Sequence, residues 1–169
     1  MSRLPSIEPV RMNQGVEWAV HVLLSLAWVD DDRPVSTAAL AASYDLPQAY
    51  LHKQLQALAR AGLLESLPGV HGGFLLARPA EKITLMDVVT AIEGPEPAFK
   101  CTEIRKNGMG ENAPKSAFRR TCAVHGAMQR AELRWRQSLA SQTIADIKEE
   151  AEAHAPSAAR IAKQAYGRV

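Results

Sequence analysis

Cysteine, aromatic residues and long apolar runs are all scarce in this sequence of 169 residues. Its two cysteines, Cys101 and Cys122, are too few for the bridged framework that a secreted domain of this size usually carries. No stretch approaches the roughly 18 uninterrupted apolar residues of a membrane span, and residues 1–12 lack the apolar centre of a signal peptide. We therefore expect a cytoplasmic protein without a membrane partner, whose thiols stay reduced or bind metal.

The remaining composition fits a small core and a weakly charged surface. Hydrophobic residues make up 47% of the chain and aromatic ones only 5%, so the core must consist mainly of Ala, Leu, Val and Ile. A net charge of +2 is mildly basic and does not by itself indicate nucleic-acid binding. The sequence has no nucleotide-binding glycine loop and no Ser/His/Asp or Cys/His set at a recognised spacing, so we do not expect an enzyme.

The first half of the chain has the pattern of three short helices. Apolar residues recur at helical spacing from Gly15 to Trp28, which predicts an amphipathic helix ended by the polar turn 30–34. Ser36 is a good N-cap for a second helix that stops near residues 44–45. A third helix follows Pro47 and ends before Gly62, because glycine is typical of the position after a helix.

A β-hairpin is predicted directly after the third helix. Residues 63–67 and 74–76 are strand-like, and the glycine-rich segment 68–73 forms the turn between them. Two helices joined by a tight turn and followed by a hairpin make a winged helix-turn-helix. The predicted fold class is therefore mainly α with a small β-hairpin wing (α+β), with a further short helix that starts at residue 83 and is closed by residues 94–95.

The second half is expected to hold a loop and a long helix. A loop as long as residues 95–121 is usually functional or disordered, and an apolar stripe on a long helix suits pairing with a second copy. We expect a flexible leader over 1–12, the winged helix-turn-helix over 13–94, a functional or disordered loop over 95–121, one dimerisation helix over 122–153 and a C-terminal tail over 154–169.

The start of the third helix is the predicted DNA-binding face, because the N-terminal part of a recognition helix meets base edges in the major groove. Glutamine suits a bidentate contact with adenine, and lysine can bind guanine or phosphate. We expect His71 and Gly72 at the wing tip to follow a minor groove, and Arg60 and Arg78 to bind phosphates. The helix residues in this prediction are Gln48, Ala49, Tyr50, His52, Lys53 and Gln56; in the alternative interpretation Tyr50 packs against the protein or binds phosphate.

Two runs of the chain combine into a specific pattern: Ala61-Gly62-Leu63, then Gly72-Gly73-Phe74 with Leu76-Ala77-Arg78-Pro79. With Ile83-Thr84-Leu85-Met86-Asp87-Val88-Val89 they resemble the BadM/IscR/NsrR-type winged-helix regulators, from about residue 13 to residue 147. The resemblance implies a homodimer that binds a palindromic operator in double-stranded DNA, and many members carry an iron–sulfur cluster that sets DNA affinity. The chain departs from the pattern in having two separated cysteines instead of three in a short loop, and Pro68 where many members have arginine.

Glu17 and His21 are candidate metal ligands on the first predicted helix. Their spacing of four residues puts both side chains on one face, about 6 Å apart along the axis. Residues 15–21 and 99–105 resemble an actinobacterial redox-sensing (RsrR-like) subgroup of the same family. That resemblance implies a [2Fe–2S] cluster bridging the dimer, held by Glu17 and His21 of one subunit and by Cys101 and Cys122 of the other.

Other ligands and other roles stay open at this point. A [2Fe–2S] cluster needs four ligands, and histidine can replace cysteine. His125, three residues after Cys122, is therefore a rival ligand, and Glu103 a weaker one. A Glu and a His four residues apart are also typical of a solvated helix face. Nine basic and three acidic residues between positions 100 and 136 favour thiolates and an anionic cluster there, or form a plain solvated surface.

We therefore predict a DNA-binding transcriptional regulator, most simply a repressor, whose operator affinity follows the redox state of the cluster. Trp18, beside a predicted ligand, is a candidate redox switch, since its packing can change with cluster state. One alternative is a metal-free regulator that responds through its thiols or a small ligand. Another is a structural winged-helix module that contacts protein, and salt-dependent DNA binding separates it from both regulators.

Overall fold

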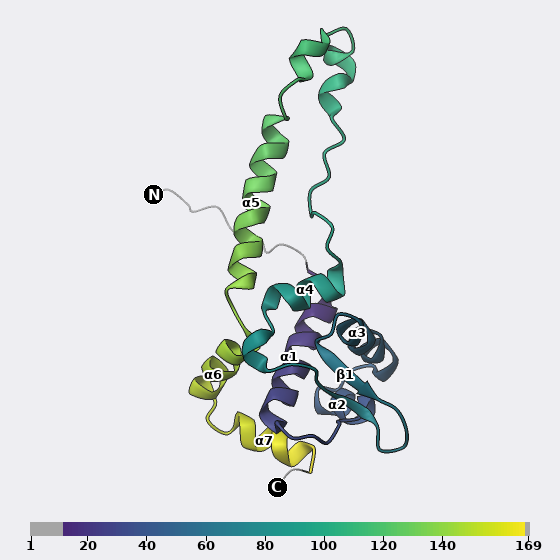
Figure 1. Ribbon diagram of the computed structural model, residues 1–169, viewed down its shortest axis with the longest axis vertical. Helices are drawn as coiled ribbons and strands as arrows, with labels where there is room; N and C mark the ends of the chain where they lie inside the picture. The colour runs from purple at the N-terminus through teal and green to yellow at the C-terminus, as the bar shows by residue number, and fades with distance from the viewer. Residues whose placement is uncertain (1–11, 168–169) are drawn as a thin grey trace.

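The computed structural model describes residues 12–167, so the leader expected over 1–12 lies outside the described residues apart from Met12. A helical body carries one long protruding segment (Figure 1). The predicted fold class is confirmed, since one antiparallel hairpin stands among helices. The elements are α1 Gln14–Val29, α2 Thr37–Ser43, α3 Gln48–Arg60, β1 Leu64–Leu67, β2 Gly73–Leu76, α4 Leu85–Glu93, α5 Ala123–Ala140, α6 Ile144–His154 and α7 Ala158–Ala165.

Helix α1 lies at the centre of the body, where α3, α4, α6, α7 and strand β2 all contact it. Ten of its sixteen residues are buried, among them Ala19, Val22 and Leu23 with no exposed surface. It begins at the Asn13 N-cap, whose side chain accepts a hydrogen bond from the backbone N–H of Gly15. Although α1 is apolar, no helix among residues 12–167 is long and apolar enough to cross a membrane.

The helix-turn-helix and the wing form as the sequence predicted. The Ser36 hydroxyl caps α2 by accepting a hydrogen bond from the N–H of Ala39, and Gly62 follows α3 in the left-handed conformation at φ 71°. Strands β1 and β2 pair in register, Leu64 opposite Leu76 and Leu67 opposite Gly73. The wing is therefore a short two-stranded ribbon that directly follows α3 in the chain.

The single helix expected over 122–153 is in fact two helices. Thr143 begins α6 with a capping box, in which its side chain accepts from the N–H of Asp146 while Asp146 accepts from the N–H of Thr143. The break is held against the start of α4, where the N–H of Ile144 donates to the carbonyl of Ile83 at 2.8 Å. The chain thus turns back onto the body between α5 and α6. The apolar residues expected to form one stripe are divided between these two helices, which run in different directions.

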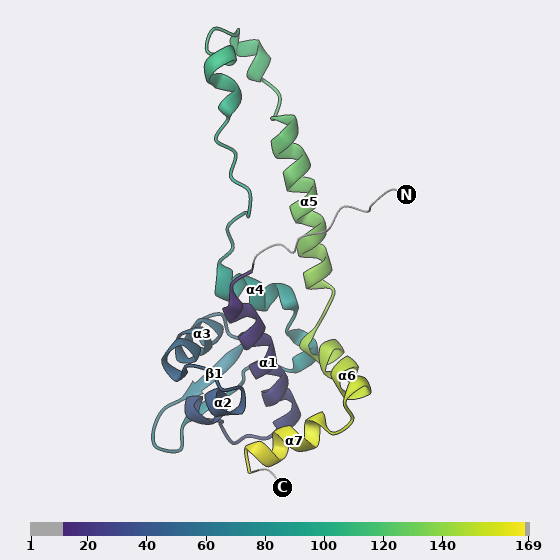
Figure 2. The ribbon, with the colours of Figure 1, turned by 180° about the vertical axis from the view of Figure 1, so that it is seen from behind.

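Residues 95–140 form an arm that leads away from the body and returns to it. The strand-free segment 95–122 runs outward through three 3₁₀ turns, and α5 runs back beside it (Figures 1 and 2). None of the described residues 95–140 is buried. Several large apolar side chains are exposed on the arm: Ile104, Met109, Val124, Met128 and Leu133. The arm therefore has no core of its own.

Gly73 is the position where the wing packs closely against the backbone that precedes α2. A Cβ built there would lie 2.2 Å from the carbonyl oxygen of Val35, and its φ of 151° is strained for any other residue. We expect Gly73→Ala to lower the free energy of unfolding by about 2 to 4 kcal/mol, measured by urea unfolding at fixed chain concentration. Gly126→Ala is the control, because its Cβ meets only a flexible Arg130 side chain and alanine favours a helix. Equal unfolding midpoints for Gly73→Ala and wild type would contradict the close approach of Val35 to the wing.

Candidate metal centre and nucleic-acid interface

The N-terminal half of α3 presents the side chains that were predicted to read DNA. Gln48, Ala49, Tyr50, His52 and Lys53 are all exposed, and Gln56, one turn further on, is half-buried. The opposite side of the same helix is buried through Leu51, Gln54, Leu55 and Leu58. This division fixes which face of α3 is free to meet a partner.

Tyr50 also contacts the N-terminal end of α1. Its ring meets that of Trp18 edge-on, with centroids 5.1 Å apart, and its hydroxyl donates to the Asn13 side-chain oxygen at 3.3 Å. Gly15 lies beside this contact, where α1 approaches α3 closely. A Cβ at Gly15 would be only 2.8 Å from the side chain of the buried Gln54, so a larger residue would not fit there. The alternative interpretation of Tyr50 as a packing residue thus describes its contacts, although 40% of its surface remains exposed.

His52 links the three parts of the winged helix-turn-helix. Its Nδ1 lies 3.1 Å from the Thr37 hydroxyl at the start of α2, and its ring lies 6.1 Å from that of Phe74 in the wing. Its Nε2 is 3.5 Å from the Gln56 amide nitrogen on the next turn of α3. The exposed edge of His52 is therefore held in place by contacts from α2, α3 and β2.

The remaining predicted DNA contacts fall in two places. Arg60 and His71 are exposed at the end of α3 and at the wing tip, where Gly72 makes the tight turn. Arg78 instead lies 3.7 Å from the Asp87 carboxylate and borders a cleft of about 910 Å³ between α1, β2 and α6. Acidic side chains dominate that cleft: Asp30, Asp31, Asp32, Glu81, Asp146, Glu149 and Glu152.

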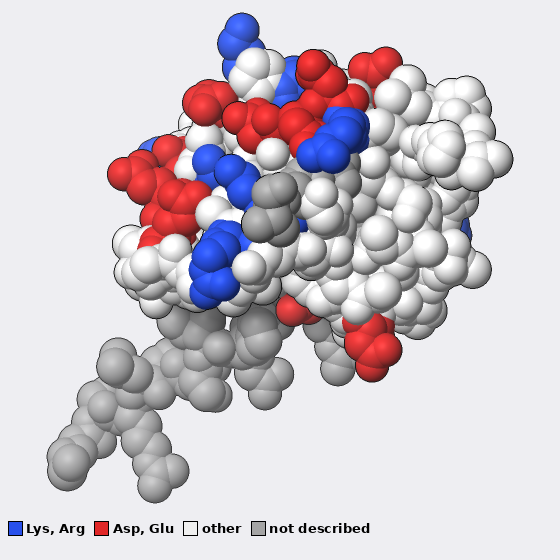
Figure 3. All heavy atoms as spheres, turned by 90° about the horizontal axis from the view of Figure 1, so that it is seen from below, with Lys and Arg blue, Asp and Glu red and all other residues white. Residues whose placement is uncertain are grey.

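Charge is unevenly distributed over the body. On the face seen in Figure 3, acidic and basic side chains gather on one side, and the other side carries almost none. The acidic cleft would repel a phosphate backbone, because like charges repel across a poorly screened surface. Of the predicted DNA contacts, those on α3 and at the wing tip therefore have surroundings better suited to a phosphate backbone than those of Arg78.

Glu17 and His21 are both exposed on α1 and border an apolar groove of about 420 Å³. The groove is lined chiefly by Met12, Val16, Val20, Leu85, Val89, Leu139 and Ile147. Leu139 comes from the end of α5, so the groove joins the body to the base of the arm. The carboxylate of Glu17 and the imidazole of His21 therefore lie on a rigid helix, at the edge of an apolar surface.

His21 is also in contact with the turn of the helix-turn-helix. Its ring lies 5.5 Å from that of Tyr44, and the Tyr44 hydroxyl donates to the backbone carbonyl of His21 at 3.2 Å. The same hydroxyl is 2.7 Å from the buried Ser25 hydroxyl. Burial raises the pKa of Tyr44, with the Ser25 bond acting in the opposite direction, so the phenol stays protonated and can donate.

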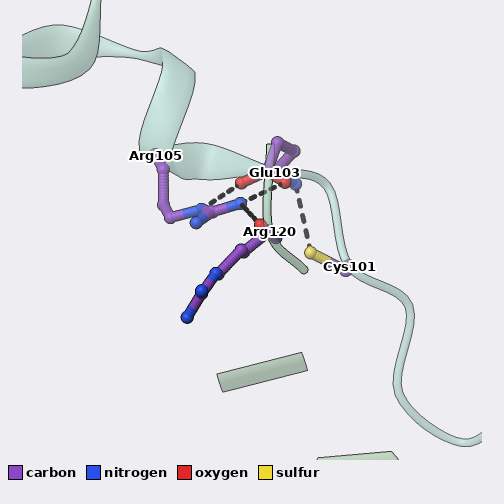
Figure 4. A network of polar contacts seen from close by, with 4 residues as sticks. All are labelled: Cys101, Glu103, Arg105 and Arg120. Carbon is purple, nitrogen blue, oxygen red and sulfur yellow. Dashed lines mark hydrogen bonds and ion pairs between the residues drawn. The ribbon is translucent and has the colours of Figure 1, made fainter. Parts of the chain in front are cut away.

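Cys101 and Cys122 are free thiols in the outer part of the arm. Cys101 accepts a hydrogen bond of 3.4 Å from the backbone N–H of Glu103 (Figure 4). Cys122 is the N-cap of α5, where the helix dipole favours negative charge on a side chain. Cys101 is exposed and Cys122 is half-buried, so both sulfurs are open to a partner or a ligand.

Arg105 stands beside both cysteines and pairs with Glu103. Its hydrogen bond lowers the pKa of Glu103 and, together with the nearby charges of Glu103, Cys122 and Cys101, raises the pKa of Arg105. Both groups therefore stay ionised at neutral pH. The guanidinium thus places a permanent positive charge near the two thiols.

His125 lies one turn into α5 from Cys122. Its ring packs against Phe99 with centroids 6.0 Å apart, and its Nδ1 is buried without a hydrogen-bond partner among the described residues. An unpaired buried nitrogen is costly, so this atom is available to a ligand or a partner. The rival role of His125 therefore stays open beside that of Glu17 and His21.

A single chain does not complete a metal centre. No three side chains of His, Cys, Asp or Glu among residues 12–167 gather closely enough to hold a metal ion. The predicted ligands instead lie in two separate pairs, which we call the predicted half-sites: the thiols of Cys101 and Cys122 on the arm, and the carboxylate of Glu17 with the imidazole of His21 on α1. Two thiolates, one imidazole and one carboxylate suit an iron–sulfur cluster in their chemistry, but they fit it only if a second copy supplies one half.

The sequence did not single out three residues of these contacts: Asn13, Tyr44 and Arg105. Asn13 directly precedes α1, and asparagine before an apolar helical run is an N-cap signal that could have been used. Tyr44 and Arg105 act through residues brought together by the tertiary fold, and neither carries a local signal.

Comparison with known proteins identifies the family. The family described as Rrf2, an iron-dependent transcriptional regulator, matches residues 12–150. Protein rrf2 of Nitratidesulfovibrio vulgaris is 31% identical over 144 residues, which cover 84% of this chain and 89% of that protein. YffB of Lactococcus lactis, named as a candidate HTH-type transcriptional regulator, is 32% identical over 141 residues, or 83% of this chain and 88% of YffB.

Solved structures share the fold at lower identity. CymR, the global cysteine regulator of B. subtilis, superposes with a TM-score of 0.65 at 21% identity, covering 84% of this chain and 98% of CymR. IscR of T. potens gives 0.64 at 22% identity, covering 86% of this chain and 91% of IscR. From the match over residues 12–150 and the relatives aligned along most of their length, this chain belongs to the Rrf2 family of winged-helix transcriptional regulators.

Proposed function

We propose that this protein is a homodimeric DNA-binding repressor whose operator affinity follows the redox state of a [2Fe–2S] cluster shared by two copies. The observation that carries the proposal is the split donor set. Cys101 and Cys122 lie on the arm, and Glu17 and His21 lie on α1; Cys101, Glu17 and His21 are exposed, and Cys122 is half-buried. In this proposal residues 13–94 read DNA, residues 95–121 form the cluster-binding loop and α5 makes the dimer contact.

The apolar side of α5 supports pairing with a second copy. Val124, Met128, Ala131 and Trp135 follow one another at helical spacing, and the first three are exposed. A helix of 18 residues is about 27 Å long, and an exposed apolar stripe of that length favours a partner with the same stripe. The exposed apolar side chains of α5 have no core within the arm, and pairing with a second copy would bury them.

Antiparallel pairing would join the two half-sites. Cys122 caps the outer end of α5, and Leu139 near its inner end lines the groove that Glu17 and His21 border. A two-fold axis across the middle of α5 therefore brings the thiol end of one copy toward the groove of the other. The two bodies would stand at opposite ends of the paired helices, as two half-sites of a palindrome require.

A bound [2Fe–2S] cluster supplies a reversible one-electron change at the junction of the two copies. The chain itself would carry the consequence to DNA through α1. Trp18 touches Tyr50 on the recognition helix, and His21 touches Tyr44 in the turn before it. A small displacement of the exposed edge of α1 thus acts on both ends of the segment that positions α3.

Mixed dimers test whether the ligands come from different copies. One chain carries Glu17→Ala with His21→Ala, and the other carries Cys101→Ala with Cys122→Ala. If ligands are shared across the dimer, each heterodimer keeps one complete site of two, while both homodimers keep none. Tandem-tagged heterodimers purified without oxygen should therefore hold about half the wild-type iron and visible absorption, because each cluster needs four ligands.

The homodimers serve as controls for the rival arrangements. If the cluster survives in the Glu17→Ala/His21→Ala homodimer, His125 or Glu103 must be a ligand in place of Glu17 and His21. A colourless heterodimer beside a coloured wild type would place all ligands in one chain. A colourless wild type from iron-sufficient cells would reject the cluster and leave a metal-free regulator that responds through its thiols or a small ligand.

The contact between Trp18 and Tyr50 should be needed for redox control. Trp18→Leu keeps apolar packing but removes the edge-on ring contact, so the ratio of operator affinities between oxidised and reduced protein should fall toward one. Fluorescence anisotropy measures this ratio, and the visible spectrum verifies an intact cluster. Trp28→Phe, at the other end of α1, is the control. An unchanged ratio in Trp18→Leu protein with a full cluster would remove Trp18 from the mechanism.

Lys53 and Gln48 should contribute to DNA binding in different ways. Lys53→Ala in both subunits should lower the slope of log affinity against log salt by about two, if each lysine binds one phosphate. Gln48→Ala should weaken operator binding by about 1–3 kcal/mol for each base that the glutamine reads, and should relax the preference at one base position. Lys163→Ala, an exposed lysine of α7, is the control. If the salt slope of Lys53→Ala equals that of wild type, Lys53 does not contact a phosphate.

A further inference from the structure

Arg105 joins the chain segments that carry the two cysteines (Figure 4). Its guanidinium donates to both carboxylate oxygens of Glu103, at 2.8 Å for the Nη2–Oε2 pair, and to the backbone carbonyl of Arg120 at 3.2 Å. Glu103 comes two residues after Cys101, and Arg120 comes two residues before Cys122. One side chain thus connects the segment that leaves the first cysteine with the segment that enters the second.

The backbone at Glu103 is held in an unusual conformation by the same contacts. Its φ of 53° is left-handed, and the other positive-φ residues besides glycine in the described chain, Asp30 and Asp45, are of a type that tolerates this region better. This conformation directs the N–H of Glu103 at the sulfur of Cys101. A strained backbone persists only where its surroundings hold it, and here the bidentate pair with Arg105 does so.

The loop closes tightly around Arg105. The guanidinium lies 5.6 Å from the centroid of the Phe118 ring, and a Cβ at Gly110 would collide with the Arg105 carbonyl. None of the described residues 95–122 is buried, so no apolar core fixes the distance between the two cysteines. Besides the contact between the Phe99 and His125 rings, the polar contacts centred on Arg105 hold this part of the arm together.

We propose that Arg105 is a positioning residue that gathers Cys101 and Cys122 into one half-site before any metal binds. This inference deepens the proposed function, because it relies on that function for the identity of the metal group that the two thiols bind. The gathering itself depends only on contacts within the arm. Arg105 touches neither sulfur through a hydrogen bond and acts through Glu103 and the Arg120 backbone.

Cross-linking of the metal-free full-length protein tests the gathering directly. Dibromobimane becomes fluorescent only when two thiols have each displaced one of its bromides, and Cys101 and Cys122 are the two cysteines of the sequence. Wild type should give a fluorescent product that migrates as a single chain on a denaturing gel. Arg105→Ala should lower the rate of this second displacement about tenfold, because the effective concentration of one thiol near the other falls.

Four further variants separate positioning from loss of charge or of folding. Arg105→Lys keeps the charge but loses the two-pronged geometry, so it should resemble Arg105→Ala. Glu103→Gln should slow cross-linking as well. Because Glu103 and Arg105 act through one shared contact, the double variant Glu103→Gln/Arg105→Ala should cross-link no more slowly than Arg105→Ala. Arg119→Ala, an exposed arginine of the same loop, should cross-link at the wild-type rate. Additive effects, or a wild-type rate in Arg105→Ala, would overturn the proposal.

Iron uptake distinguishes this inference from the function on which it rests. After anaerobic reconstitution with iron and sulfide, Arg105→Ala and Arg105→Lys should both retain less iron per chain than wild type and Arg119→Ala. Full iron in both Arg105 variants would overturn the role of Arg105 in site assembly. If wild type itself takes up no iron, the proposed cluster fails, while the cross-linking rates still decide whether Arg105 gathers the thiols.

Discussion

Burial of α1 is the constraint on which the rest of this structure depends. Because α3, α4, α6, α7 and the wing strand all pack on this helix, its orientation cannot change without repacking the core. Its outward edge, which carries Glu17 and His21, lies beside the contacts of Trp18 with Tyr50 and of His21 with Tyr44, which join α1 to α3 and to the turn before it. If Glu17 and His21 bind a metal centre, their place on a buried helix keeps their spacing, and a force applied to them would act on the whole body instead of being dissipated in a loop.

The arm has the opposite physical character. None of the described residues 95–140 is buried, and the segment is held by local polar contacts and by its attachment to α4 and α6. Segments with few buried apolar contacts open at low free-energy cost. This explains why a clamp such as the pair of Arg105 with Glu103 matters there, whereas a single exposed ion pair would add little to the stability of the body.

Local signals predicted most of the body, and long-range contacts account for what they missed. The Ser36 cap, the left-handed Gly62 and the glycine-rich wing turn are short-range features, so the sequence located α2, the end of α3 and the hairpin. The helix expected over 122–153 was wrong because apolar periodicity continues across the break, while the capping box of Thr143 with Asp146 was overlooked. Arg105 carries no signal in one sequence, because its importance comes from two segments that only the folded arm brings together.

A donor set split between a rigid helix and a weakly held arm couples three equilibria. In the proposed dimer, anything that binds the complete site also favours association of the two copies, because neither copy alone offers enough ligands. The same linkage runs in reverse, so operator DNA that selects one spacing of the two bodies would change the affinity and the redox potential of the shared site. The arm of one copy would then act on α1 of the other, and through Trp18 and Tyr50 on the recognition helix of that other copy. Control in trans follows from the position of the ligands and requires no change within the core of either subunit.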